Sequence, residues 1–410
     1  MAGRSSRRGR PPRHCMVVEN HWPDIRVERE ALALLARGYE VDVVCEEGAG
    51  YRPGTTREDG VTVHRLPVRR RGGAGRAAQL VEYLSFFVRA TVRVASLHRS
   101  RRYDSVQAHN VPDFLVFAAI VPKLTGASVV LDLHDLMPEF FASRFQKPMS
   151  SLTVRVLQVQ ERLSVAFADH VLTVSDLWRR TLIERGAPAH RVSVVMNLPD
   201  PGSFGVPLER TLDHDGATRI LYHGTFAHRL GVDLLLDAVG LLRSRYSLHL
   251  TLHGQGEMLD VLRSRSQELG LDDIVTFSTT RLPTRELGSL IASADIGVVP
   301  YRNDVFTDGI VPTKLMEYAY FGVPSVASRS SAVLHYFGAE AVAYCEPGDV
   351  DSLRTAIESL LSDGERRQEL GRRIREFSST HRWEEEAARY SALVESLRPS
   401  RRNAALQEQR

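Results

Sequence analysis

In the second half of the chain a short strand, a turn, a helix and another strand follow one another, and this order limits the possible folds more than any other feature. Residues 296–300, Ile-Gly-Val-Val-Pro, form an apolar run that is typical of a buried parallel strand. A helix follows Pro312, with Thr313 as its expected side-chain cap, and Gly322 ends it. Residues 325–328 begin a further strand, so the segment predicts a right-handed parallel unit.

The start of this helix is a predicted anion site. The first N–H groups of a helix have no partner within it, and together with the helix dipole they favour a phosphate beyond the strand end. Lys314 and Glu317 are three residues apart and share one face of the helix. The amine can meet a phosphate, and the carboxylate can accept hydrogen bonds from a ribose diol. A solvated ion pair is the competing interpretation of these two residues.

Length and composition favour a globular protein of two domains. A chain of 410 residues is too long for one ordinary core. Its composition, 43% hydrophobic and 25% charged residues, is typical of a globular protein. Its net charge of +3 argues against a dedicated nucleic-acid binder. Cys15, Cys45 and Cys345 lack metal-ligand spacing, so neither a zinc site nor a disulfide framework is expected, and the cytoplasm is the expected location.

Strands and helices alternate in both halves of the chain. In the first half, strands are predicted at residues 14–18, 41–45, 105–108, 129–133, 171–174 and 192–196, and the first helix at 27–37. In the second half, strands are predicted at residues 219–222, 248–252, 274–277, 296–300 and 325–328. Short connections make such units parallel, so the predicted fold class is α/β with two doubly wound Rossmann-like domains.

The predicted organisation has five parts. They are a disordered basic arm at residues 1–13, a first domain at 14–197, a proline- and glycine-rich link at 198–216, a second domain at 217–375, and a last helix returning to the first domain with a tail at 376–410.

Polar residues follow two strands of the first half. His109 and Asn110 follow one strand, and His134 follows the next, with Glu139 just beyond it. The carboxyl ends of parallel strands form the ligand edge of a doubly wound sheet. A single histidine is more often structural, but two at corresponding strand ends favour a site.

Residues 69–102 combine a basic loop with a helix whose apolar residues cover more than one face. One interpretation is a helix that docks on an anionic membrane surface or holds a lipid-linked acceptor. The other is a core helix with a basic, solvated edge. No stretch of the chain reaches the roughly 18 apolar residues of a membrane span.

A nicotinamide dinucleotide site is a weaker interpretation of the second half. Gly254 and Gly256 follow a strand, and Asp273 lies about 20 residues further on, as in that class. However, the third glycine is missing and Asp273 precedes its strand, so the pattern fails twice.

Several of these segments, in the same order, resemble the retaining glycosyltransferases of family 4. Lys314-Leu315-Met316-Glu317-Tyr318, followed by Gly322-Val323-Pro324, is similar to the family's nucleotide-sugar loop, whose glutamate holds the donor ribose. Glu317 matches that glutamate. A second glutamate that many members carry eight residues earlier is Gly309 here, so the role of the neighbouring Asp308 stays open.

The resemblance extends to the loop after the first strand of the second half. His223-Gly224-Thr225, with Arg229 beyond, is similar to the family's phosphate-binding segment. The donor-binding residues implied in this way are Gly224, Thr225, Arg229, Gly254, Gly256, Asp308, Gly309, Ile310, Val311, Pro312, Thr313, Lys314 and Glu317.

In the first half, the segment from Asp24 resembles the family's first loop and helix. The Gly-Gly pair of many members is absent, and Arg26 is expected to supply charge instead. His134 matches by context a histidine near the reacting sugar, so it is the expected catalytic residue. The expected acceptor or cleft residues are Asp24, Arg26, His109, Asn110 and Glu139. No metal site is expected, because Asp213-His214-Asp215 lies in the polar link instead of at a strand end.

The resemblance covers about residues 14–395 and implies two domains facing a cleft, the GT-B fold. It also implies a retaining, metal-independent transfer of a sugar from a nucleoside-diphosphate sugar to a glycan, lipid-linked or small-molecule acceptor, without a further cofactor or a nucleic-acid partner. Two alternatives remain. One is a nucleotide-sugar 2-epimerase of the same architecture, and the other is a non-catalytic module tethered to a membrane or polyanion. If residues 69–102 contact lipid, the protein is expected at the inner face of the membrane.

Overall fold

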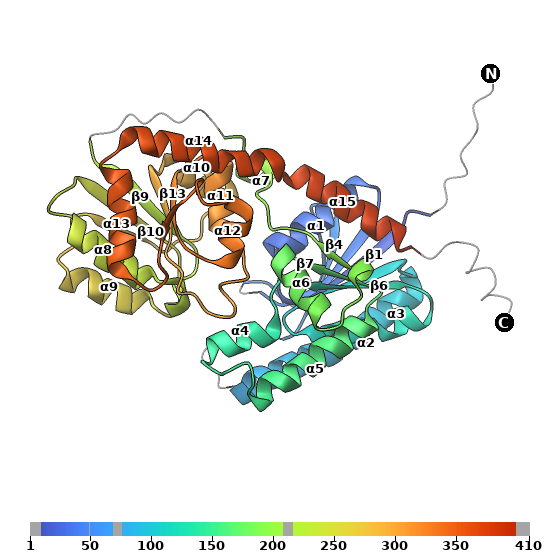
Figure 1. Cartoon of the computed structure of the whole chain (residues 1–410). Helices are drawn as coiled ribbons and strands as arrows, with labels where there is room; N and C mark the ends of the chain where they lie inside the picture. Colours follow the sequence, from blue (N-terminus) through green and yellow to red (C-terminus); the bar gives the residue numbers. More distant parts are fainter. Residues whose placement is uncertain (1–9, 49, 69–75, 208–215, 399–410) are drawn as a thin grey trace, which may run out of the picture. The chain divides into compact units, whose positions relative to one another are not determined.

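The computed structural model describes residues 10–48, 50–68, 76–207 and 216–398, which divide into two compact units (Figure 1). Unit 1 comprises the chain through Phe141, Pro148–Val195 and the chain from Glu386. Unit 2 comprises Ala142–Lys147 and Met196–Glu385. Each unit has a largely parallel sheet with helices, so the predicted class of two doubly wound Rossmann-like domains is confirmed. The basic loop at 69–73, the acidic triplet at 213–215, most of the arm and the tail lie outside the described residues.

Unit 1 is built on an eight-stranded sheet in the order β3-β4-β2-β1-β5-β6-β7-β8. Its strands are β1 (Arg13–His21), β2 (Glu40–Glu46), β3 (Gly54–Glu58), β4 (Val61–Leu66), β5 (Ser105–His109), β6 (Ser128–Leu133), β7 (His170–Thr173) and β8 (Val192–Val194). All neighbours pair in parallel except β3 and β4, which are antiparallel. The six strands predicted from apolar runs are confirmed. Their side chains are buried on both faces of the sheet, which explains why their sequences are continuously apolar.

The helices of unit 1 connect these strands. They are α1 (Ile25–Ala36), α2 (Arg76–Arg101), η1 (Asp113–Ala119), α3 (Ile120–Leu124), α5 (Leu152–Phe167), α6 (Asp176–Glu184) and η2 (Ala189–Arg191). The helices α4 (Met137–Arg144) and α15 (Trp383–Ser396) each contain a boundary between the units. The Tyr390 hydroxyl of α15 is buried in unit 1 and donates to Gln107 Oε1 at 2.8 Å. No described helix is both long and apolar enough to cross a lipid bilayer.

The β3–β4 hairpin is absent from the prediction. Its turn has Asp59 and Gly60 at φ 47° and 87°, the left-handed conformation that two-residue hairpin turns require. The Asp-Gly dipeptide is a known signal for such a turn. β3 is largely exposed, so it lacks the apolar pattern by which the other strands were found.

Unit 2 is built on a six-stranded sheet in the order β11-β10-β9-β12-β13-β14, and every neighbouring pair is parallel. The strands are β9 (Thr218–His223), β10 (Leu248–His253), β11 (Val275–Ser278), β12 (Ile296–Val299), β13 (Ser325–Ser328) and β14 (Ala343–Cys345). The helices are α7 (Pro201–Phe204), η3 (His228–Leu230), α8 (Val232–Leu242), α9 (Leu259–Glu268), α10 (Thr284–Ser293), α11 (Thr313–Phe321), α12 (Ser331–Phe337), α13 (Val350–Leu361) and α14 (Gly364–Thr380). Leu235, Leu250 and Ile357 are among the buried residues that join helices to the sheet.

Two local predictions for unit 2 are wrong. The expected link is not wholly irregular, because Pro201 occupies the first turn of α7, where its fixed φ is favourable and its missing N–H has no helical partner to lose. Phe204 of α7 is buried, with its ring 6.4 Å from that of Phe321. At α11 the cap residue is Pro312 in extended conformation, so Thr313 is the first helical residue and does not supply the side-chain cap.

Candidate functional site

The strand order of unit 2 reverses beside β9, and both loops of the expected donor site leave the sheet at that point. The chain lays down β9, β10 and β11 in one direction and then places β12 on the other side of β9. Open α/β sheets bind ligands outside the carboxyl ends of the strands where the order reverses. Gly224 and Thr225 follow β9, and residues 300–312 follow β12, so the topology brings the two loops to the same edge.

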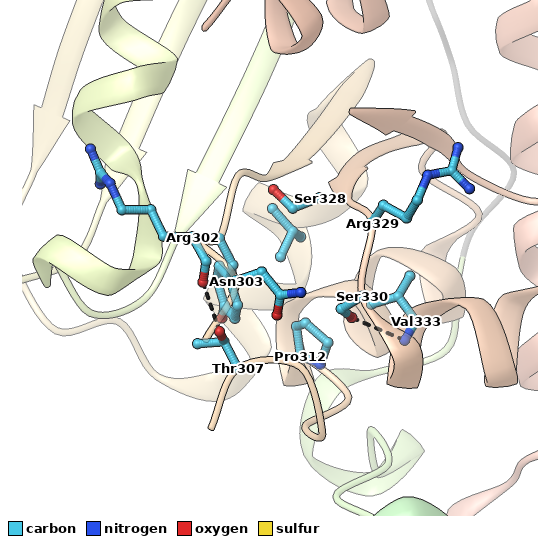
Figure 2. Close-up of a pocket in the computed structure, with 10 residues that line it drawn as sticks. Arg302, Asn303, Thr307, Pro312, Ser328, Arg329, Ser330 and Val333 are labelled. Atoms are coloured by element: carbon cyan, nitrogen blue, oxygen red, sulfur yellow. Dashed lines mark hydrogen bonds between the residues drawn. The ribbon is translucent and has the colours of Figure 1, made fainter. Parts of the chain in front are cut away.

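The loop of residues 300–312, the β12–α11 loop, is held by its own side chains. The Thr307 hydroxyl donates to the Arg302 carbonyl oxygen at 2.7 Å, as Figure 2 shows. The Asp304 carboxylate accepts the backbone N–H groups of Phe306 and Thr307, both at 2.9 Å. These bonds stabilise one conformation of the loop, which lowers the conformational entropy that the loop would lose on binding a ligand.

Asp308 joins this loop to the next helix. Its Oδ1 atom accepts the backbone N–H of Ser331 at 2.8 Å and the side-chain amide of Asn303 at 3.2 Å. A small pocket lies beside the loop, and Asn303, Thr307 and Ser330 are among its lining residues (Figure 2). The sequence left the role of Asp308 open. In this structure its side chain supports the β12–α11 loop by joining it to the start of α12.

Arg229 lies in η3, next to the same loop. The backbone N–H of Arg302 donates to the Arg229 carbonyl oxygen at 2.9 Å, and the Arg302 guanidinium pairs with Asp233 at 2.6 Å. The Arg229 guanidinium lies 5.9 Å from the ring centre of Phe306. The structure thus brings Arg229 and the β12–α11 loop together.

Lys314 is buried instead of sharing an open face with Glu317. Its side chain is 5% exposed, and its ammonium donates to the Tyr301 hydroxyl at 2.8 Å while lying 5.0 Å from the ring centres of Tyr222 and Tyr301. Burial opposes the charge of Lys314, but the two tyrosines and Glu317 raise its pKa above the ordinary value. A methyl group at Gly224 would lie 3.1 Å from Lys314 Nζ, so this cation lies directly against the loop after β9.

In unit 1 the strand order reverses between β1 and β5, and a buried carboxylate lies at the ends of the neighbouring strands. Both oxygens of Asp132 accept from the Arg26 guanidinium, at 2.7 and 2.8 Å, and Oδ2 lies 2.9 Å from His109 Nδ1. Arg26 also donates to the Val195 carbonyl oxygen at 2.8 Å and pairs with Glu30 at 3.3 Å. This differs from the expectation that Arg26 supplies charge to a phosphate, because two carboxylates and a carbonyl already hold its guanidinium.

His134 is the partly exposed member of this group. Its side chain is 26% exposed, and its Nδ1 atom lies 3.9 Å from Asp132 Oδ2. Asn110 Oδ1 accepts the backbone N–H groups of His134 and Asp135 at 3.1 and 3.3 Å, so Asn110 fixes the loop that carries His134. Burial alone would lower the pKa of His134, but Asp132 and Asp135 raise it above the usual value.

Asp24 lies at the start of α1, where its carboxylate accepts the backbone N–H groups of Arg26 and Val27. Burial would raise the pKa of Asp24, but the neighbouring His134 and the bond from Val27 lower it. Asp24 and His134 therefore lie close enough to interact. Glu139, by contrast, is buried in an ion pair with Arg185, whose guanidinium also binds Glu161 at 3.0 Å.

Among the described residues, the ligand atoms of His109, Asp132 and His134 lie within 4.8 Å of one another, a spacing that a metal ion could use. The Arg26 guanidinium, however, covers both oxygens of Asp132. A cation would have to displace a buried positive charge, so this group does not fit a metal centre.

Comparison with known proteins identifies the family. Residues 23–197 match the profile of the glycosyl transferase 4-like domain, and residues 209–377 match that of the glycosyl transferases group 1. The chain belongs to the group 1 glycosyltransferases.

Curated relatives of the chain are also glycosyltransferases. The chain is 31% identical over 181 residues to the GDP-mannose-dependent alpha-(1-6)-phosphatidylinositol monomannoside mannosyltransferase of Mycolicibacterium smegmatis, covering 42% of this chain and 46% of that protein. It is 28% identical over 199 residues to an amylovoran biosynthesis glycosyltransferase of Erwinia amylovora, covering 48% of each chain. The chain thus spans about half the length of the curated relatives it matches.

Two solved structures support the GT-B fold. Sucrose-phosphate synthase of Thermosynechococcus elongatus superposes with a TM-score of 0.75 at 19% identity, covering 94% of this chain and 99% of that chain. HepE of Anabaena, solved with UDP and glucose, superposes with a TM-score of 0.69 at 17% identity, covering 93% and 99%. At these identities the likeness concerns the fold alone.

Two residues of this glycosyltransferase that lie in the candidate sites were not among the expected site residues. His223 is the last residue of β9 and contacts Glu317. Asp132 is the second-last residue of β6 and binds Arg26. Both are polar residues at the carboxyl ends of apolar strands. That position is itself a signal in a doubly wound sheet.

Gly254 and Gly256 of the glycosyltransferase allow the loops after β9 and β10 to approach closely. A methyl group at Gly254, whose φ is 153°, would lie 1.8 Å from the Gly224 carbonyl oxygen, and one at Gly256 would lie 2.2 Å from that of Phe226. The clashing atoms belong to the backbone, so a side-chain movement cannot relieve them. These glycines therefore shape the loops after β9 and β10 by packing.

We expect Gly254→Ala to lower the free energy of unfolding by about 2–4 kcal/mol, because it forces the two loops apart. Gly348→Ala is the matched control, since Gly348 also has a positive φ, 79°, but nothing lies within 4 Å of the added methyl group. The control should lose only about 1 kcal/mol. Urea denaturation of both variants measures the difference, and equal losses would contradict the packing role.

Proposed function

We propose that the chain is a retaining, metal-independent glycosyltransferase that moves a sugar from a nucleoside-diphosphate sugar to an acceptor. The observation that carries the proposal is the meeting of Lys314, Glu317 and the start of α11 at the point in unit 2 where the strand order reverses. A diphosphate there would receive hydrogen bonds from the N–H groups of the helix start and face the fixed charge of Lys314. The ribose would donate to Glu317.

The proposed reaction breaks the bond between the sugar C1 atom and the phosphate oxygen and forms a bond from C1 to the acceptor oxygen on the same face. The leaving diphosphate takes the proton of the acceptor hydroxyl. Lys314 and Arg229 stabilise the negative charge that develops on the diphosphate, which is the help a metal ion gives in other enzymes. The acceptor is proposed to bind unit 1 at the ends of β1, β5 and β6, where His134 and Asp24 offer polar groups.

The choice of substrates to test follows from the relatives. One is named as dependent on GDP-mannose and acting on phosphatidylinositol monomannoside, one as acting in amylovoran biosynthesis, and one structure holds UDP and glucose. We therefore propose GDP-mannose and UDP-glucose as the first donors, and glycan or lipid-linked acceptors of polysaccharide or glycolipid synthesis.

The first experiment is a thermal-shift screen of GDP, UDP, ADP and dTDP and their sugars. Stabilisation by one nucleoside diphosphate supports the donor site and names its base. Incubation of the stabilising sugar nucleotide with the protein and no acceptor then separates two enzyme classes, since an epimerase converts the donor alone and a transferase requires an acceptor. If no nucleotide stabilises the protein, the proposed function fails.

The proposal includes contact of unit 1 with an anionic membrane through α2. One face of α2 is buried through Phe86, Ala90 and Val94, all 0% exposed. Another face carries a solvent-exposed apolar stripe, namely Leu80, Val81, Leu84, Val88 and Val92, which are 52%, 65%, 47%, 58% and 66% exposed. Among the described residues, α2 thus packs into the core on one side and exposes apolar side chains on another.

The nearby α5 carries a second stripe of this kind. Leu152, Val156, Val159 and Leu163 follow one another at helical spacing and are 79%, 58%, 53% and 59% exposed. Both α2 and α5 pack against η1. Two apolar stripes with arginines between their residues suit insertion into the headgroup region of an anionic bilayer.

We expect the double substitution Leu84→Glu with Val88→Glu to weaken binding to vesicles rich in anionic lipid by roughly tenfold or more. It replaces apolar side chains that the membrane would bury with carboxylates that the anionic lipid headgroups repel. Vesicle sedimentation measures this. The control is Val261→Glu on α9 of unit 2, a single valine that is 54% exposed. Equal binding of all variants would show that α2 does not contact the membrane.

A further inference from the structure

Unit 1 also contains a cavity that is lined by α5, the end of α6 and the segment before β8. Its volume is about 370 Å³, which is in the range of small-molecule pockets. Three arginines against one carboxylate give the lining a net positive charge, which favours an anionic ligand. Val165 and Leu182 are among its apolar lining residues, and its charged ones are Glu161, Arg162, Arg185 and Arg191.

An ion pair joins two walls of this cavity. Glu161 of α5 is 1% exposed, and it pairs with the guanidinium of Arg185, the residue after α6, at 3.0 Å. Arg185 also binds Glu139, so two carboxylates hold it in place. Burial raises the pKa of Glu161 to about 7, although Arg185 opposes this, so the carboxyl is partly protonated near neutral pH. Glu161 therefore repels an anion in the cavity only weakly.

Arg162 and Arg191 are the cations that remain available to a ligand. Both residues are exposed, and neither side chain forms an ion pair or a hydrogen bond with another described residue. Arg191 is placed by η2, where its backbone N–H donates to the Pro188 carbonyl oxygen at 2.8 Å. The N–H groups of a guanidinium lie in one plane and match the oxygens of a phosphate. The two arginines thus offer a place for a phosphate group.

The apolar stripe of α5 continues into the cavity. Arg162 lies three residues after Val159 and four before Ala166, so these side chains form one row along the helix. Val159 is 53% exposed and belongs to the stripe, and Ala166 lines the cavity. A ligand with a phosphate in the cavity can therefore extend an apolar part along the stripe. An anionic phospholipid has both parts.

We propose that this cavity, the α5–α6 pocket, binds the phosphate headgroup of an anionic phospholipid, with Arg162 and Arg191 as the residues that contact the phosphate. The acyl chains leave the pocket along the apolar stripe of α5. The inference rests on the part of the proposed function that concerns the membrane. It goes beyond that part, because it assigns a specific lipid site to unit 1 in addition to a general attraction to anionic lipid.

The test measures the binding of dihexanoyl phosphatidic acid to the whole protein by calorimetry, below the concentration at which this short lipid forms micelles. Wild type should bind it at least about tenfold more tightly than dihexanoyl phosphatidylcholine, whose ammonium group the arginines repel. Arg162→Gln with Arg191→Gln should weaken the binding of phosphatidic acid at least about tenfold, since it removes two charge-assisted contacts.

The matched control is Arg155→Gln with Arg180→Gln. It removes the same charge from exposed positions of α5 and α6 that do not line the pocket, so it should bind phosphatidic acid as wild type does. Equal losses in the two double variants would show that only overall charge matters and would overturn the pocket. All four arginines are exposed, so the thermal midpoint should change little in either variant.

Inorganic phosphate is the second probe. If it binds as tightly as phosphatidic acid, the pocket belongs to a free phosphate and the lipid assignment is overturned. Absence of binding of either probe by wild type would overturn the inference as a whole. The monomeric lipid offers no membrane surface, so these results are independent of the membrane contact of α2. The screen of nucleoside diphosphates tests the glycosyltransferase separately.

Discussion

Asp132→Ala is expected to destabilise unit 1 by about 3–5 kcal/mol, because it leaves the buried guanidinium of Arg26 without its main counter-charge. Asp132 is 0% exposed and Arg26 7% exposed, so water cannot replace the lost partner. Burial alone would raise the pKa of Asp132, but the Arg26 guanidinium and the hydrogen bond with His109 hold it well below its usual range. Chemical denaturation followed by the fluorescence of Trp22 and Trp178 in unit 1 measures the loss.

A double variant separates the energy of the ion pair between Arg26 and Asp132 from the cost of burying each charge. In the double variant Arg26→Met with Asp132→Leu both charges are gone, so its loss should be smaller than the sum of the single losses. Glu40→Ala is the control for a surface ion pair, since Glu40 pairs with Arg13 at 2.7 Å but is 40% exposed, and its loss should stay within about 1 kcal/mol. Additive losses in the double variant would show that the ion pair is not the main contribution.

Glu317→Ala is expected to lower the affinity for the nucleoside diphosphate by about 10- to 100-fold, and the rate of transfer at least as much. A hydrogen bond to a charged group contributes about 1.5–3 kcal/mol, and the ribose would lose at least one such bond. Glu317→Gln keeps an acceptor without the charge, so its loss should be intermediate. Calorimetry with the stabilising nucleotide and a transfer assay measure the two quantities.

The fold of the Glu317 variant is a separate question. Glu317 is partly exposed on α11, so its removal should change the thermal midpoint of the unliganded protein by only a few degrees. Glu268→Ala on α9 removes the same charge from an exposed position, where the side chain is 64% exposed, and should bind the nucleotide as wild type does. Wild-type affinity in Glu317→Ala would remove the main support for the donor site.

Most of the fold could be predicted from the pattern of apolar residues. Runs such as residues 41–45 and 296–299 are buried on both sides of their sheets, so the apolar signal is continuous and clear. The β3–β4 hairpin was missed because β3 is largely exposed and has no such signal. The short α7 was missed because proline and glycine usually break regular structure, whereas Pro201 occupies the first turn, where proline is favourable.

The sequence predicted where the site lies along the chain, but it did not predict which side chains contact one another there. The spacing of Lys314 and Glu317 on one helix indicated a site, but it could not show that Lys314 is buried against two tyrosines from other segments. Arg26 was expected to supply charge in the first loop of unit 1, whereas in the structure it binds Asp132, 106 residues further along the chain. Such partners meet only when the sheet is assembled.

The sequence by itself determined the order of strands and helices, the doubly wound class, and the residues that follow each strand, because all of these depend on local patterns of apolar, proline and glycine residues. The tertiary structure alone decided which of those residues are buried and paired. It made Arg26 part of an internal ion pair and Asp308 a support for the loop, and it set His223 beside Glu317. The physical reason is that burial and charge pairing depend on distances between strands far apart in the chain, which no local pattern encodes.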